Sequence, residues 1–277
     1  MSQKRLALKV YYDGSHFNGF QRQPHSHTVE GKLLEVFQKL GIINEVKESR
    51  WQYASRTDKG VSALGQVIAF DIPNNVYSVI RKRGLMWINI RLLPHIALWA
   101  YSEVPKDFNP RRDALSREYV YIYPYQGEDL ELIRSACNLL SGKHDYSFIA
   151  KAHGVSTVRD VLITVSKEGG YLIFKVKGHS FYRYLIRKIL GVILCVGRGE
   201  LNLEKLQYHM QTRKALDIKP VGSKGLILWK VDYENVSFNT DLRCLRCLFK
   251  VLQNELLSHA YAYGIKRAFL EYFSSLL

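Results

Sequence analysis

The sequence predicts an α+β fold built on a largely antiparallel sheet. Strand-like and helix-like segments are mixed along the chain, without the regular alternation that is typical of a parallel sheet. A hairpin is expected where Val158–Val165 and Tyr171–Val176 flank Glu168-Gly169-Gly170. The 277 residues, of which 47% are hydrophobic, can bury a sizeable core in one large domain or two smaller ones.

The first half of the chain is expected to hold three strands and one clear helix. Arg5–Tyr12 has the side-chain alternation of a strand, and Asp13-Gly14-Ser15 marks the turn after it. A loop over 17–24 follows. Thr28 then caps a helix whose apolar residues keep helical spacing as far as Leu40. The other expected elements are a strand over Leu64–Phe70, a partly helical stretch over Asn74–Arg91 and a strand over Ile96–Glu103.

The second half begins with a basic loop over Asp107–Arg112 and a strand over Arg117–Tyr123. Alternation along this strand puts Tyr119, Tyr121 and Tyr123 on one face. The further expected elements are a helix over Leu130–Leu140 ended by Gly142, the hairpin described above, a long helix over Phe181–Val196, a helix over Leu203–Arg213, a last strand over Lys224–Tyr233 and an all-helical tail from Glu234 to Leu277. These elements fall into a first part, 1–105, a second part, 106–233, and a helical extension, 234–277.

The charge balance points to a polyanionic partner. The formal net charge is +15, and the excess of lysine and arginine is spread along the whole chain. A folded basic protein most often binds nucleic acid, although charge kept for solubility or for a membrane surface is the alternative. No apolar stretch approaches the 20 residues of a membrane span, and the first residues lead directly into a strand without a signal peptide. We therefore expect a cytoplasmic protein.

Metal, redox and nucleotide-binding motifs are missing from the sequence. Cys244-x-x-Cys247 is the one close pair among four cysteines, and it lies in a helix-like run without a second pair to complete a zinc site. The nine histidines show no metal-ligand spacing. The P-loop, dinucleotide, zincin and hydrolase signatures do not occur. No metal and no cofactor are expected.

Asp58 is the first candidate for chemistry. It lies in a turn between Arg56 and Lys59-Gly60, directly before the strand over Leu64–Phe70. Gly60 permits a tight turn, and a carboxylate paired with a base stays ionised, as a nucleophile needs. Taken alone, an acid in a turn is more often a cap or the partner of a nearby base.

Two residues far from Asp58 in the sequence are candidate partners for it. Tyr119 either packs in the core or stacks on a base that has been taken out of its helix. Arg187 lies among apolar residues of the long helix. It either reaches from that helix to solvent or pairs with an anion, which would be Asp58 or a phosphate.

Several segments together resemble the TruA-type tRNA pseudouridine synthases. These segments span Leu6 to Tyr233 in the order that the family shows. They are Tyr12-Asp13-Gly14-Ser15-x-Phe17-x-Gly19-Phe20-Gln21-x-Gln23-Pro24 with Thr28-Val29-Glu30-Gly31, Arg56-Thr57-Asp58-x-Gly60-Val61-x-Ala63-x-Gly65-Gln66-Val67, Arg117-x-Tyr119-x-Tyr121, Gly178-x-Ser180-Phe181 through Ile186-Arg187-x-Ile189-x-Gly191 to Val196-Gly197-x-Gly199, and Gly225-Leu226-x-Leu228 with Val231 and Tyr233.

A few positions depart from the family pattern. Ser55 stands where many members have glycine, and Lys59 and Ser62 replace a common alanine and histidine, a spelling that resembles archaeal and eukaryotic members. His144-Asp145-Tyr146-Ser147 keeps a family motif, with Ile149 where an aromatic residue is usual. The helical tail lies outside the pattern.

The resemblance implies a pseudouridine synthase fold with two halves, a shared sheet and a basic central cleft. It implies a homodimer that converts uridines of the anticodon stem-loop, at tRNA positions 38–40, without metal or cofactor. By this resemblance Asp58 is catalytic and starts cleavage of the C1′–N1 bond, while Tyr119 stacks on the flipped base and helps to remove the C5 proton. Arg187 pairs with Asp58, and Arg56 holds or replaces the extruded nucleotide.

Further basic and amide side chains are candidates for contact with tRNA. They are Gln21, Arg22, Lys59, Arg111, Arg112, Arg183 and Lys188. Two rival hypotheses are an RNA-binding module that has lost catalysis and a metal-dependent hydrolase that uses Asp58. The charge fits an RNA-binding module as well as an enzyme, but the intact Arg56-Thr57-Asp58 favours the enzyme.

Overall fold

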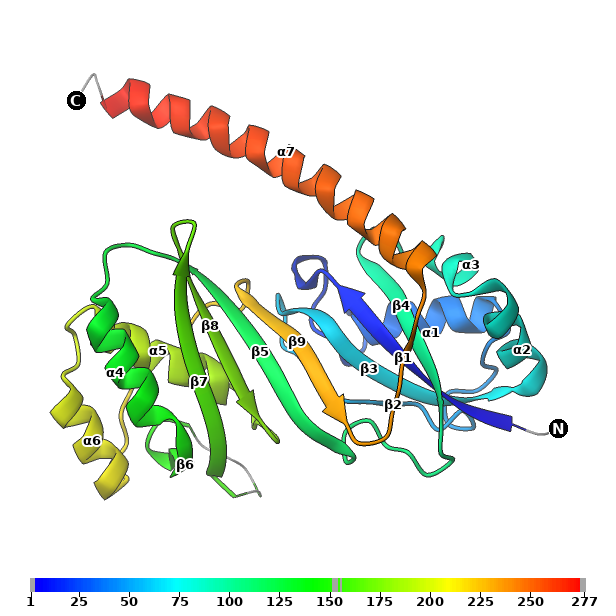
Figure 1. Cartoon of the computed structure of the whole chain (residues 1–277), viewed down its shortest axis with the longest axis horizontal. Coiled ribbons are helices and arrows are strands. Elements are labelled where there is room, and N and C mark those ends of the chain that lie inside the picture. The colour runs from blue at the N-terminus through cyan, green and yellow to red at the C-terminus, as the bar shows by residue number, and fades with distance from the viewer. Residues whose placement is uncertain (1–2, 151–153, 155, 275–277) are drawn as a thin grey trace.

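The computed structural model describes residues 3–150, 154 and 156–274 of the chain. In this part of the chain, strands from both halves join in one ten-stranded sheet (Figure 1). The strands are β1 (Gln3–Tyr12), β2 (Gln52–Tyr53), β3 (Ser62–Pro73), β4 (Ile96–Val104), β5 (Ala114–Pro124), β6 (Gly142–Asp145), β7 (Val158–Glu168), β8 (Tyr171–Gly178), β9 (Leu226–Tyr233) and β10 (Asn239–Thr240).

Helices pack on this sheet and one projects from it. In the view of Figure 1, α1 lies behind β4, α5 lies behind β7 and β8, and α7 extends beyond the body. The helices are α1 (Val29–Lys39), α2 (Asn74–Arg83), α3 (Met86–Asn89), α4 (Leu130–Leu140), α5 (Leu185–Gly197), α6 (Leu203–Thr212) and α7 (Leu242–Ser274), with short 3₁₀ turns at Gly14–His16 and Tyr146–Phe148. None of the described helices is both long and apolar enough to cross a membrane.

The α+β class and the mainly antiparallel sheet are confirmed. The strand order is β10-β4-β1-β3-β9-β5-β8-β7-β6, with β2 paired to β3. The two groups of strands meet where β3 runs parallel to β9, through Ser62 opposite Ile227 and Ala63 opposite Leu228. Just beyond this contact, a Cβ on Gly65 would lie 2.4 Å from the carbonyl oxygen of Trp229. Glycine is therefore required for β9 to approach β3 this closely.

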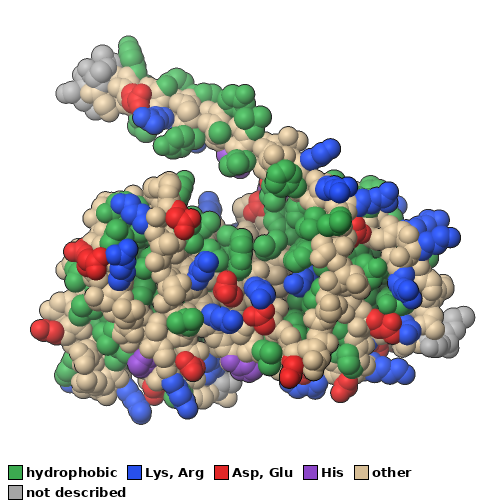
Figure 2. Space-filling model, viewed as in Figure 1, with side chains coloured by type: hydrophobic (Ala, Val, Ile, Leu, Met, Phe, Trp, Pro, Cys, Tyr) green, Lys and Arg blue, Asp and Glu red, His purple; other side chains and the backbone are tan. Residues whose placement is uncertain are grey.

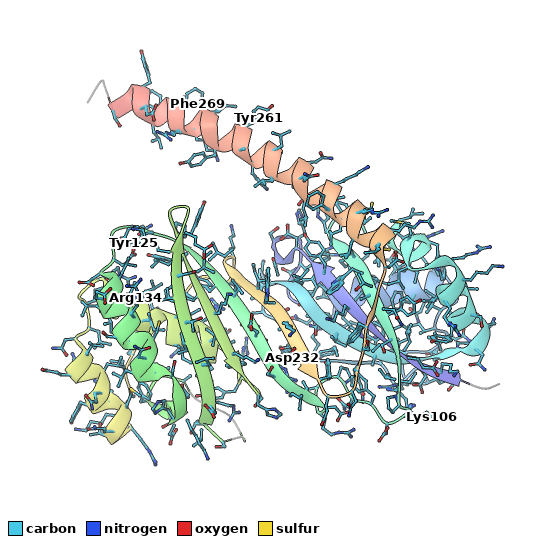
Figure 3. All side chains as sticks on the ribbon, viewed as in Figure 1. Lys106, Tyr125, Arg134, Asp232, Tyr261 and Phe269 are labelled. Carbon is cyan, nitrogen blue, oxygen red and sulfur yellow. The ribbon has the colours of Figure 1, made fainter. Side chains whose placement is uncertain are left out.

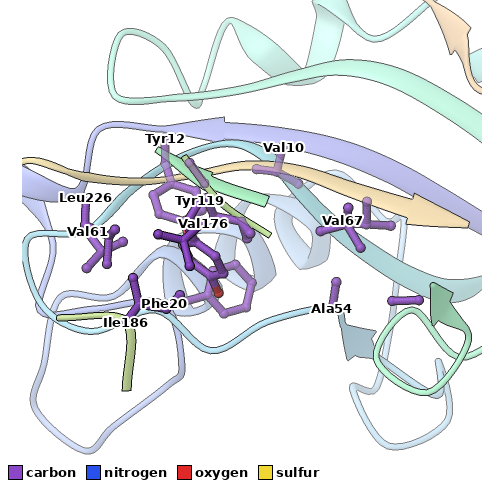
Figure 4. Packing of buried hydrophobic residues seen from close by; sticks show 14 of the residues in the cluster. Val10, Tyr12, Phe20, Ala54, Val61, Val67, Tyr119, Val176, Ile186 and Leu226 are labelled. Carbon is purple, nitrogen blue, oxygen red and sulfur yellow. The ribbon is translucent and has the colours of Figure 1, made fainter. Parts of the chain in front are cut away.

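A continuous apolar core runs beneath the junction of the two groups of strands. Figure 4 shows Tyr12 and Val10 of β1, Val67 of β3 and Tyr119 of β5 among its members, with Ile186 of α5 close to them. Tyr12 is completely buried, so its bulk is part of the core although its hydroxyl bonds to the loop that precedes β3. The core therefore reaches directly to the segment that holds Asp58.

The long helix predicted over Phe181–Val196 begins four residues late. Tyr184 has φ of 65°, in the left-handed region, and α5 starts at Leu185. An α-helix cannot pass through a residue in that conformation. Arg183, which lies within the predicted range of this helix, therefore belongs to the loop before α5.

The tail predicted as helical from Glu234 is helical only from Leu242. Residues 234–241 are extended or irregular, and Asn239–Thr240 forms β10 against β4, so the strand over Leu226–Tyr233 is not the last. Asp241 ends this segment because its carboxylate accepts hydrogen bonds from the backbone N–H groups of Arg243 and Cys244, at 3.1 Å each, and so caps α7. The last part of the prediction, 275–277, lies outside the described residues.

We expect Asp71→Asn to destabilise the protein strongly. Arg5 donates from Nη1 to Asp71 Oδ1 at 2.8 Å, and both side chains are almost fully buried. The second oxygen of Asp71 accepts from Arg50 Nε at 2.6 Å. Removing the charge leaves the buried guanidinium of Arg5 uncompensated, which costs about 3–5 kcal/mol.

Urea denaturation measures this loss of unfolding free energy, and Asp107→Asn, at an exposed acid, is the control. A loss below about 1 kcal/mol at Asp71, the range of an exposed ion pair, would contradict the assignment of a buried ion pair.

Stability is expected to fall as the pH drops below about 6.5 in part because of His95. Its ring stacks on His16 with centroids 3.6 Å apart. Burial, and then the charge of His16, lower the pKa of His95 below its ordinary value. The unfolded state then binds more protons at low pH, so the stabilisation is present above the unfolded pKa and lost below it. Between pH 8 and pH 5.5, the melting temperature of His95→Gln should fall by less than that of the wild type. An equal fall would exclude His95 as a cause of the pH dependence.

Candidate active site

A cavity of about 700 Å³ lies where the two halves of the sheet meet. Its walls come from four separate parts of the chain, so no single segment contains it. They are the loop Ala54–Asp58 with Val61, the basic loop with Asn109, Arg111 and Arg112, strand residues Arg117, Tyr119 and Leu226, and the run from His179 to Arg187. The cavity therefore gathers residues that the sequence places far apart.

The loop that carries Asp58 is held firmly by the core beneath it. The hydroxyl of Tyr12 is 2.7 Å from Thr57 Oγ1, and the N–H of Phe20 donates to the Thr57 carbonyl at 3.2 Å. Gly60 turns the chain with φ of 82°, and the N–H of Val61 donates to the Asp58 carbonyl. The Asp58 side chain is 29% exposed, so a rigid backbone presents a carboxylate that a ligand can reach.

Arg187 pairs with Asp58 across the cavity. Arg187 Nη1 lies 3.5 Å from Asp58 Oδ2, within the range of an ion pair but longer than a close charge-assisted hydrogen bond. Its Nε donates to the carbonyl of Val221 at 2.7 Å. The N–H of Val221 in turn donates to the carbonyl of Arg187 at 2.9 Å. The guanidinium is thus fixed from behind while its outer edge faces the carboxylate.

The segment 216–222 crosses α5 behind Arg187 and can do so because Gly191 is small. A Cβ at Gly191 would lie 2.5 Å from the carbonyl oxygen of Lys219. Any larger residue would therefore push the segment, and with it the Val221 carbonyl, away from Arg187. The position of the Arg187 guanidinium therefore depends on the close contact at Gly191, which lies one turn further along α5.

Tyr119 forms the aromatic part of the wall. It is 6% exposed, and the ring of Phe181 meets it edge-on with centroids 5.6 Å apart. Its hydroxyl is 2.7 Å from Ser55 Oγ. Burial raises the pKa of Tyr119, so the hydroxyl is a neutral phenol at neutral pH. Ser55, the departure from the family pattern, is therefore the hydrogen-bond partner of this tyrosine.

Arg117 holds three walls of the cavity together, a role that our sequence analysis did not assign to it. It is 5% exposed and donates from Nη2 to the carbonyls of Ala54, at 2.9 Å, and Arg111, at 2.7 Å. Its Nη1 donates to the carbonyl of His179 at 2.5 Å. The one sequence signal that could have identified Arg117 as a site residue is its position in the Arg117-x-Tyr119 motif.

The structure brings together most of the predicted site residues. Asp58, Tyr119 and Arg187 line the cavity, with the four arginines Arg56, Arg111, Arg112 and Arg183. The candidates Gln21, Arg22, Lys59 and Lys188 are not among its lining residues. Tyr182 and Tyr184 do line it, although the sequence analysis did not select them.

This arrangement suits a flat, uncharged ring that carries phosphate groups. Tyr119 and Phe181 offer apolar and aromatic surface, and the surrounding arginines supply positive charge for phosphates. The carboxylate of Asp58 is the acidic group among the cavity-lining residues. Among the residues that the structure describes, no group of three or more histidine, cysteine or acidic side chains could hold a metal ion.

In the comparisons with known proteins, the family model and the similar proteins carry the same description. A family model described as tRNA pseudouridine synthase matches residues 136–234. Over 239 residues the chain is 37% identical to tRNA pseudouridine synthase A of Thermococcus kodakarensis, covering 86% of this chain and 88% of that protein. It is 34% identical over 269 residues to the protein of the same name from Thermococcus sibiricus, covering 96% and 97%. It is 38% identical over 232 residues to that of Methanococcoides burtonii, covering 83% and 82%.

The bond between Ser55 and Tyr119 gives a prediction about stability. Ser55→Ala leaves a buried tyrosine hydroxyl without a partner and should reduce the free energy of unfolding by about 1–3 kcal/mol. Adding Tyr119→Phe removes the unpaired hydroxyl, so the double variant should regain part of that loss. Urea denaturation of the wild type, both single variants and the double variant gives the coupling energy. Strict additivity would show that the two hydroxyls do not interact.

Proposed function

Because the chain belongs to the tRNA pseudouridine synthase family, we propose that it isomerises uridine in the anticodon stem-loop, at tRNA positions 38–40, with Asp58 as the catalytic residue. Family membership establishes the class of enzyme, and the choice of uridines and the roles of residues are proposed. The observation that carries the proposal is the reachable Asp58 carboxylate, paired with Arg187 in a cavity that is aromatic on one side and ringed by arginines.

The reaction exchanges one bond of the uracil ring for another. The C1′–N1 bond breaks, the freed ring turns, and C5 forms the new bond to C1′. C5 then loses its proton and N1 gains one, so that no atom is added or removed. Asp58 acts as the nucleophile or base that starts the cleavage, and the bond or proton that it takes is given back when C5 bonds to C1′. The uracil ring keeps the electron pair of the broken bond on N1, so it must turn as an anion without leaving the cavity.

Tyr119 provides the surface on which the ring turns. Its side chain is packed against Phe181 and bonded through its hydroxyl to Ser55, so it keeps its position when a base enters. A fixed aromatic ring can stack on a base taken out of its helix, whatever the orientation of that base. Because Tyr119 is a neutral phenol, it can accept the C5 proton only while passing its own hydroxyl proton on through the hydrogen bond to Ser55 Oγ, 2.7 Å away.

Arg187 orients the carboxylate of Asp58. With Nε held by the Val221 carbonyl, its outer edge stays opposite Asp58, and the 3.5 Å spacing allows the carboxylate to reach the sugar or the ring. Arg187 is thus a positioning residue for Asp58.

The arginines around the rim account for RNA binding. Arg56, Arg111, Arg112 and Arg183 line the cavity, and Arg56 is placed to hold or replace the extruded nucleotide. Outside the cavity, Gln21, Arg22, Lys59 and Lys188 extend the contacts along the anticodon arm. Each phosphate contact releases counterions, so affinity for tRNA should fall steeply as salt rises.

Two features of organisation are part of this proposal. The halves 1–105 and 106–233 act as the two sides of the RNA cleft, with 234–277 as an extension. The active form is a homodimer in which one tRNA contacts both copies. The strand order, in which β3 and β9 join the two groups of strands, supports the first feature.

Asp58→Asn should abolish product formation and leave tRNA binding almost unchanged. Removing a nucleophile costs at least roughly 10³-fold in rate. Affinity for tRNA should stay within about threefold, because phosphate contacts dominate it. Incubation with unmodified tRNAs, followed by chemical mapping of pseudouridine, measures the first effect, and filter binding measures the second.

The matched control is Asp107→Asn, an exposed acid that does not line the cavity. Full turnover by Asp58→Asn would show that another group starts the reaction. Absence of product from the wild-type protein on every tRNA tested would refute the enzymatic function. Product confined to uridines outside positions 38–40 would refute the proposed specificity alone.

A further inference from the structure

Helix α7 leaves the body of the protein after its first turns. Cys244 and Leu248 are buried against the body, where α7 meets β4 and α3. Beyond Glu255, every described residue of α7 is exposed. This outer part, 256–274, rises about 28 Å from its last contact with the body, at 1.5 Å per residue. Figure 3 shows Tyr261 and Phe269 on it, well away from the sheet.

The outer part of α7 carries apolar side chains that no other described part of the chain covers. Figure 2 shows hydrophobic side chains along the projecting helix. Leu256, Tyr263 and Leu270 are 71%, 68% and 67% exposed. A helix with this composition is normally buried, and a helix of about 20 residues without packing is only marginally stable in water. The surface therefore requires a partner.

Charge argues against RNA or a membrane as that partner. The outer part has one acidic side chain, Glu271, and two basic ones, Lys266 and Arg267, so its net charge is only +1. Arg267 is already paired with Glu271 at 2.7 Å. RNA and anionic lipid surfaces both select helices with a clear excess of lysine and arginine. An apolar protein surface fits this part of the helix better.

Spacing along α7 identifies the kind of protein surface. Large exposed apolar residues lie on more than one face of α7, and one set among them recurs every seven positions, at Leu242, Phe249, Leu256, Tyr263 and Leu270. All five are more than 60% exposed. We call these five residues the α7 stripe. A seven-residue repeat is the pattern by which one helix packs along another.

A second set of residues completes the repeat. Leu245, Leu252 and Phe273 each follow a stripe residue by three positions, as the second apolar position of a heptad does. His259 and Lys266 occupy the two remaining positions of this set. Polar residues at such positions select the register of a helix pair at some cost in stability.

We propose that the α7 stripe packs against the α7 stripe of a second copy of this chain and forms the centre of a dimer interface. Every copy carries the same stripe, so one contact surface serves both partners, as two-fold symmetry requires. A stable interface needs about 800 Å² from each partner. The stripe and its neighbours supply this area, since one aromatic side chain alone can bury about 150–250 Å².

This inference names the surface for the homodimer proposed above and does not depend on which uridines are modified. It also explains why the helix persists beyond the body. In a monomer, the outer turns would gain nothing from packing. In a dimer, each α7 provides the apolar surface that the other requires.

Sedimentation velocity of the full chain at micromolar concentration tests the proposal. The wild type should be a dimer. Leu256→Gln should raise the dimer dissociation constant at least about tenfold, because one leucine is lost from each of two copies. Leu256→Gln combined with Leu270→Gln should give monomers. Leu257→Gln is the matched control, since Leu257 is 55% exposed on the same turn but lies outside the stripe.

The alternative outcomes are distinct. A monomeric wild type would overturn the proposal, and so would stripe variants that dimerise as tightly as the Leu257→Gln control. If the wild type is monomeric and the stripe variants lose affinity for tRNA, the surface is an RNA contact instead. Far-UV circular dichroism of the variants shows whether the body remains folded. A dimeric wild type that makes no pseudouridine would refute the proposed reaction and leave the pairing intact.

Discussion

The parallel contact between β3 and β9 is the constraint on which the rest of the structure depends. Two residue pairs join the two groups of strands into one sheet, and Gly65 permits the close approach beside them. The loop with Asp58 ends where β3 begins, so this contact sets the position of the carboxylate relative to Tyr119 on β5. A shift at this junction would separate the two halves of the cavity.

Around this junction, hydrogen bonds made by buried polar groups hold the residues of the cavity in place. Arg117 donates to carbonyls of three different loops, Tyr12 bonds to Thr57, and the Val221 carbonyl holds Arg187. Each of these contacts satisfies a polar group that burial would otherwise penalise, and each is directional. The result is a rigid wall that places one carboxylate and one guanidinium opposite each other, with open space beside them.

Helix α7 differs from the body in the exposure of its apolar side chains. The body buries its apolar side chains beneath a sheet, whereas the outer part of α7 exposes them along its length. The requirements of a single chain do not explain such a surface, because none of the residues that the structure describes covers it. Assembly with a second copy is the simplest way to bury this apolar surface. Such an assembly would connect the helical extension with the homodimer proposed for the enzyme.

The sequence by itself determined the α+β class, the positions of most strands and helices, and the three residues at the centre of the site. Alternation and helical spacing are local properties, and Asp58, Tyr119 and Arg187 lie in motifs that can be read along the chain. Only the tertiary structure decided where α5 begins, since the left-handed conformation of Tyr184 leaves no mark in apolar spacing. It also revealed the link from Ser55 to Tyr119 and the role of Arg117, because hydrogen bonds between distant segments depend on how strands are paired. Asp58 was visible as an acid in a turn, but its distance from Arg187 is a property of the folded sheet alone.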